Sequence, residues 1–101
     1  MVRTMQEMVK EVIYGNRFGL QAVATAADLL AAEVRFDIWC QENLKTREKE
    51  GKLIEALDLH EELRARCENF VAELMNGGDA SIFILESEKI IGEIQSFVDR
   101  V

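Results

Sequence analysis

Residues 82–101 read IFILESEKIIGEIQSFVDRV, and this stretch decides the fold class of the chain. From Ile90 onward its apolar residues recur three or four positions apart, which is the spacing of one face of an α-helix. The first four residues, Ile82 to Leu85, would suit a β-strand if they stood alone. Because the helical spacing continues to Val101, we interpret them as the first turn of a helix over 81–101.

This last helix carries two neighbouring apolar rows. The first row comprises Phe83, Ser87, Ile90, Ile94, Phe97 and Val101, and the second comprises Ile84, Ile91 and Val98. Together they make an apolar face wider than the roughly 100° that a single core contact needs. We therefore expect part of this face to contact another chain.

Breaks in the sequence divide the rest of the chain into further helices. Asn76-Gly77-Gly78-Asp79 is the strongest break, because two glycines end one helix and either Asp79 or Ser81 can cap the next. Gly15 favours a second helix end, although the apolar spacing continues in phase beyond it, so a bend is the alternative there. The predicted helices cover residues 2–14, 17–47, 52–75 and 81–101.

The polar segment 45–52 separates the two central helices. Gly51 follows several basic residues and is predicted to stop a helix, which makes the segment the tip of a helical hairpin. The alternative is one helix from 17 to 76, about 90 Å long, which only a dimer could cover. We expect an all-α fold of one domain, residues 1–101. It would be a small antiparallel bundle of three to four helices with a long central hairpin, completed by self-association.

Size and patterning favour a partner for this bundle. The chain has 101 residues, of which 49% are hydrophobic, and it has no proline. A core of this size is only marginally stable alone. The second helix carries one apolar stripe (Val23, Ala27, Leu30, Val34 and Ile38) and further apolar residues outside it. The predicted interface consists of Phe36, Trp39, Phe83, Ile84, Ile91 and Val98.

The charge of the chain excludes several classes of partner. The net charge is −7, and residues 52–101 hold 11 acidic residues against 5 basic ones. Such a surface repels nucleic-acid phosphates and anionic lipid, so we expect neither nucleic acid nor membrane as a partner. Two cysteines are too few for a disulfide scaffold, and no secretion signal is visible. We expect a cytoplasmic protein.

His60 is the only histidine and the first candidate for chemistry. A small acidic helical protein with one histidine invites comparison with histidine phosphotransfer domains, but these need a basic and a small residue soon after the histidine. Here Glu61 and Glu62 follow, and two carboxylates would repel an incoming phosphoryl group. We expect His60 to be a packed structural residue.

Metal and nucleophile motifs are also incomplete. One histidine cannot supply the two Glu-x-x-His pairs of a di-metal bundle, and zinc sites of the structural type need about four Cys and His ligands. The acids Glu61, Glu62, Glu68 and Glu73 lack the spacing of a magnesium cluster, because Ala65 stands where the third acid is needed. No catalytic, cofactor-binding or metal-binding residue is predicted.

The surplus of apolar surface therefore gives the functional prediction. We expect a non-enzymatic helical protein–protein interaction module, such as an adaptor, assembly factor, small chaperone or inhibitor, that acts through an apolar helical face. Its partner would be another protein, in the first instance a second copy in a homodimer. The alternative is a small helical phosphotransfer or carboxylate- or metal-dependent enzyme that uses His60 and neighbouring acids.

Overall fold

Four helices build the part of the chain that the structure describes. The computed structural model describes residues 3–15, 17–43 and 50–100, and these form α1 (Met5–Gly15), α2 (Leu20–Asn43), α3 (Glu50–Met75) and α4 (Ala80–Arg100), with no strand among them. The predicted all-α bundle is confirmed. None of the helices in these ranges is both long and apolar enough to cross a membrane.

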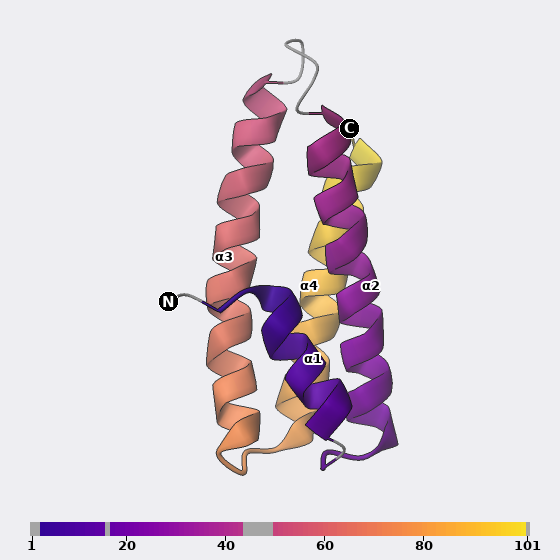
Figure 1. The fold of residues 1–101 in the computed structure, drawn as a ribbon, viewed down its shortest axis with the longest axis vertical. Helices are drawn as coiled ribbons and strands as arrows, with labels where there is room; N and C mark the ends of the chain where they lie inside the picture. Colours follow the sequence, from indigo (N-terminus) through magenta and orange to yellow (C-terminus); the bar gives the residue numbers. More distant parts are fainter. Residues whose placement is uncertain (1–2, 16, 44–49, 101) are drawn as a thin grey trace.

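The three long helices stand side by side, and α1 lies obliquely in front of them (Figure 1). The chain runs up α2, down α3 and up α4, so α2 and α4 are parallel although they are not consecutive. Helix α1 packs on both α2 and α3 over one half of their length. Because α2 and α3 run in opposite directions, the hairpin is confirmed and the single long helix is excluded.

Gly51 does not stop a helix, and this prediction is wrong. It lies in the first turn of α3, which begins at Glu50. An exposed glycine in a helix lowers its stability by only about 0.5–1 kcal/mol relative to alanine. The residues after Gly51 stabilise the helix enough to offset this cost. Residues 45–49 of the polar segment lie outside the described residues. The predicted break at Gly15 is confirmed, because α1 ends there and α2 begins at Leu20.

Local hydrogen bonds fix the helix ends. At the start of α1, the backbone N–H of Glu7 donates to Thr4 Oγ1 and the backbone N–H of Thr4 donates to Glu7 Oε1, which is a capping box. At the start of α4, Asp79 Oδ1 accepts the backbone N–H of Ser81, so Asp79 is the cap among the two candidates, Asp79 and Ser81, that the sequence offered.

The end of α3 is a glycine turn. Gly77 has a φ of 90°, and its N–H donates to the carbonyl of Leu74, while the N–H of Gly78 donates to the carbonyl of Glu73. These two bonds form a Schellman motif, which satisfies carbonyls that a helix end leaves free. The break at 76–79 is thus the sharp turn between α3 and α4 that the sequence predicted.

The core contains aromatic clusters between α2 and α4 and between α3 and α4. The ring of Phe36 stacks on Phe97, and Trp39 meets the same Phe97 ring edge-on with centroids 5.2 Å apart. Phe70 and Phe83 form a second edge-on pair between α3 and α4. Helix α1 contributes four buried side chains, Met5, Met8, Val9 and Val12. The fold therefore buries one continuous core that all four helices share.

Candidate functional site

The residues predicted to form an interface divide into two groups. Phe36, Trp39 and Phe83 are buried in the chain's own core, so they belong to no surface that this fold presents. Ile84, Ile91 and Val98 are half-buried on one side of α4.

Helix α2 turns an apolar face outward. Leu20, Val34 and Ile38 are 91, 39 and 48% exposed. The full set of exposed apolar residues, which we call the α2 seam, is Leu20, Ala24, Ala27, Ala31, Val34 and Ile38. Their spacing alternates between four and three residues, which is the repeat by which one helix packs along another. Three of them, Ala27, Val34 and Ile38, belong to the stripe identified from the sequence, and that stripe points mainly to solvent.

A hollow connects the α2 seam with the half-buried row of α4. Its volume is about 120 Å³. Its lining is mostly apolar, with Asp28, Arg35 and Gln95 as polar members: Asp28, Ala31, Ala32, Arg35, Ile91, Ile94, Gln95 and Val98. Two of the predicted interface residues, Ile91 and Val98, therefore lie beside the α2 seam and extend its apolar surface onto α4.

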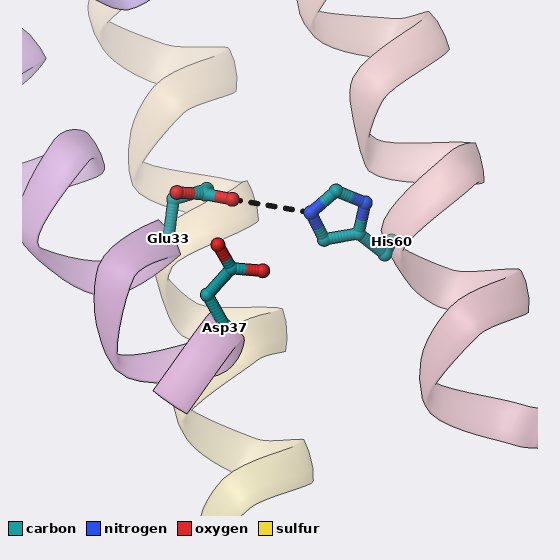
Figure 2. A group of neighbouring side chains, drawn as sticks. All are labelled: Glu33, Asp37 and His60. Atoms are coloured by element: carbon teal, nitrogen blue, oxygen red, sulfur yellow. Dashed lines mark hydrogen bonds and ion pairs between the residues drawn. The ribbon is translucent and has the colours of Figure 1, made fainter. Parts of the chain in front are cut away.

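A second feature lies on a different side of α2, where polar side chains from three helices meet. His60 of α3 faces Glu33 and Asp37 of α2, which are one helical turn apart (Figure 2). His60 Nε2 lies 3.1 Å from Glu33 Oε1, within hydrogen-bond distance. From α1, Gln6 Nε2 donates to Glu33 Oε2 at 2.5 Å and lies 3.5 Å from Asp37 Oδ2. We call these four residues the polar cluster.

The polar cluster perturbs the protonation of its members. The hydrogen bond to Glu33 raises the pKa of His60, although burial acts in the opposite direction. Burial, followed by the charge of Glu33, raises the pKa of Asp37. Glu33 is only 3% exposed, which is rare for a carboxylate unless it is paired. His60 is half-buried, and its ring and the Phe36 ring are nearly perpendicular, with centroids 5.8 Å apart.

The acids near His60, Glu33 and Asp37, were not predicted from the sequence. The chain neighbours of His60, Glu61 and Glu62, are exposed, and Glu61 pairs with Arg64 instead. Glu68 pairs with the same Arg64 from the other side. The feature of the sequence that could have identified the partners of His60 is Glu33, an acid that directly follows the alanine-rich stretch of α2. A charged residue on the buried side of an apolar helix calls for a partner across the core.

The two thiols are structural. Cys67 is fully buried, and burial raises its pKa to about 12. Cys40 is 9% exposed, and burial also raises its pKa, with Asp37 and Glu33 adding to the effect. A thiol with a raised pKa is a poor nucleophile, so neither cysteine is prepared for covalent catalysis.

Comparison of the chain with protein families, with curated proteins and with solved structures found no match. The α2 seam and the polar cluster are therefore the two features of this chain from which a function can be inferred.

Proposed function

We propose that the protein is a non-enzymatic helical interaction module that binds another protein helix through the α2 seam. The observation that carries this proposal is the exposure of a continuous apolar stripe over the length of α2. An exposed apolar surface of this kind is unfavourable in water and is typical of a docking surface. Covering a large aliphatic side chain contributes roughly 1.5–3 kcal/mol when burial is complete.

The order of side chains along the α2 seam favours a second copy as the partner. The largest residues stand at its two ends, Leu20 and Ile38, and alanines occupy the middle. Two antiparallel copies would place Leu20 against Ile38, Ala24 against Val34 and Ala27 against Ala31. Helices that cross at an angle are closest at the crossing point and diverge towards their ends. Alanines at the centre and larger side chains outside suit that geometry.

A twofold pairing has the further advantage that one patch serves both chains. In a symmetric dimer each copy contributes the same surface, so a self-complementary stripe is sufficient. The half-buried Ile91 and Val98 would lie at the margin of the contact, beside the hollow between α2 and α4. They would extend the buried area beyond the single helix.

A cytoplasmic location and a protein partner are part of the same proposal. Both cysteines are free, which suits the reducing cytoplasm. The net charge of −7 supports a protein partner over nucleic acid or an anionic membrane. The acidic second half would steer basic partners towards the module if it also binds a different protein.

Sedimentation of the purified chain tests the proposed dimer. We expect about twice the 11.5 kDa mass of one chain at tens of micromolar protein. Ala27→Lys places a charge at the centre of the α2 seam and should leave a folded monomer. Ala65→Lys is the matched control, because Ala65 is also exposed in mid-helix but lies on α3. A wild-type mass of one chain, or a dimer that tolerates Ala27→Lys, overturns the proposal.

A further inference from the structure

We propose that Glu33, Asp37 and His60 bind a divalent first-row transition-metal ion between α2 and α3. Each residue offers one ligand atom, and the three atoms lie within 4.8 Å of one another. The side chains point toward a common space from two different helices (Figure 2). Two carboxylate oxygens and one imidazole nitrogen form a donor set that suits manganese, iron(II), cobalt and zinc. This inference is independent of the α2 seam.

The distances in the polar cluster are close to those of a bound ion. Bonds of about 2.0–2.2 Å from a metal to nitrogen and oxygen place neighbouring ligand atoms about 3–3.5 Å apart. His60 Nε2 and Glu33 Oε1 are already 3.1 Å apart. Asp37 comes from the next turn of the helix that carries Glu33, so rotation of its side chain brings in the third oxygen.

The negative charge of the two carboxylates in the polar cluster also favours the binding of a cation. Glu33 and Asp37 are two carboxylates in close proximity, and Glu33 is almost fully buried. Among residues 3–15, 17–43 and 50–100, the one ion pair that either carboxylate makes is the contact of Glu33 with His60. No lysine or arginine in those ranges pairs with them. Two adjacent carboxylates that share only a titratable histidine as a partner are costly inside a protein, and a divalent ion would neutralise both.

The surroundings support a site that is closed on one side and accessible on the other. Glu33 lies in the core, whereas the side chain of His60 is 30% exposed and Asp37 is half-buried. The ion could enter from the side of His60, and three protein ligands would leave coordination positions for water. Gln6 acts as a positioning residue, because its amide holds Glu33 Oε2 while Oε1 faces His60. Such outer hydrogen bonds orient ligands and strengthen binding.

Titration with Mn²⁺ and Co²⁺ tests the site directly. Calorimetry should give one ion per chain, and Co²⁺ should develop visible absorption bands. Loss of an outer hydrogen bond costs about 10–100-fold in metal affinity, so Gln6→Ala should fall in that range. Loss of a ligand should cost at least as much, so His60→Gln and Asp37→Asn should each weaken binding by about 100-fold or more. Glu62→Gln removes an exposed carboxylate two residues from His60 and should bind as the wild type does.

Circular dichroism of each variant separates loss of the ligand from loss of the fold. Asp37→Asn preserves shape at a half-buried position, so it serves as the second test if His60→Gln unfolds. The proposal is overturned if the folded wild type binds neither ion at millimolar concentration, or if both ligand variants bind as tightly as the wild type. A thiolate-to-Co²⁺ absorption band that disappears in Cys40→Ser would assign the ion to the thiol and would equally overturn it.

Discussion

The ring of Phe36 on α2 lies almost parallel to the ring of Phe97 on α4, with centroids 5.7 Å apart and planes 6° apart. The Phe36 side chain is fully buried, and its ring also lies nearly perpendicular to the His60 ring, with centroids 5.8 Å apart. We expect Phe36→Ala to lower the free energy of unfolding by about 3–5 kcal/mol, because it removes aromatic contacts and leaves a cavity. Urea denaturation measures this loss. Ile54→Ala, at a residue that is 59% exposed on α3, should change it by less than about 0.5 kcal/mol. Equal effects would contradict the assignment of the core.

Replacement of Gly78 and of Gly92 by alanine should change the stability of the protein in opposite directions. A Cβ on Gly78 would lie 2.6 Å from the carbonyl oxygen of Glu73, and that backbone atom cannot move without disturbing the end of α3. A Cβ on Gly92, within α4, would meet nothing within 4 Å. We expect Gly92→Ala to stabilise the protein by about 0.5–1 kcal/mol and Gly78→Ala to destabilise it by more than that. Thermal melting of both variants gives the signs. Stabilisation by Gly78→Ala would show that the turn is formed differently.

The Cys67 thiol should resist alkylation in the native protein. Its pKa is raised to about 12 by burial, against about 8.5 for a free cysteine. At pH 8 this lowers the thiolate fraction by about three orders of magnitude, and the side chain is also inaccessible. We expect iodoacetamide to modify Cys67 only after denaturant is added, as followed by mass spectrometry of the peptides. Rapid labelling in native buffer would show that α3 opens locally.

Because Asp79 caps α4, the stability of the protein should depend on pH in the acidic range. The backbone N–H of Ser81 lowers the pKa of Asp79, so the cap favours the ionised carboxylate. A group whose pKa is lower in the folded state contributes stability above its unfolded pKa, near 4, and loses it as the pH falls through the folded pKa. We expect the melting temperature of the wild type to fall more steeply below pH 4 than that of Asp79→Asn. Asparagine can still cap the helix but does not titrate there. Parallel curves would exclude a contribution from the Asp79 charge.

The sequence was sufficient to predict the helices and their breaks, because both depend on local signals. The apolar spacing of residues 90–98 and the glycines at 77 and 78 act within one or two helical turns. The end of the central hairpin was harder to predict. Gly51 resembles a helix stop, but the penalty for one exposed glycine is smaller than the gain from the helix that follows.

The orientation of α2 could not be predicted, because that helix is apolar on two sides. The spacing of the apolar residues alone cannot decide which face of α2 turns into the core, the face with Val34 and Ile38 or the face with Phe36 and Trp39. The larger aromatic side chains turn inward, where they meet Phe97 of a helix about 60 residues later. The partners of His60 could not be predicted either, because Glu33 is 27 residues away in the chain and only the packing of α2 on α3 brings the two together.

The parallel arrangement of α2 and α4 has a consequence for how fast the chain folds. Phe36 and Phe97, which join the two most extensively packed helices, are separated in sequence by all of α3. Contacts between distant residues require closure of a long loop before they contribute any stability, and proteins rich in such contacts fold more slowly. We therefore expect this bundle to fold more slowly than one in which each helix packs mainly on its neighbour in sequence. Formation of the α2–α4 contact, and not of the individual helices, would then limit the rate.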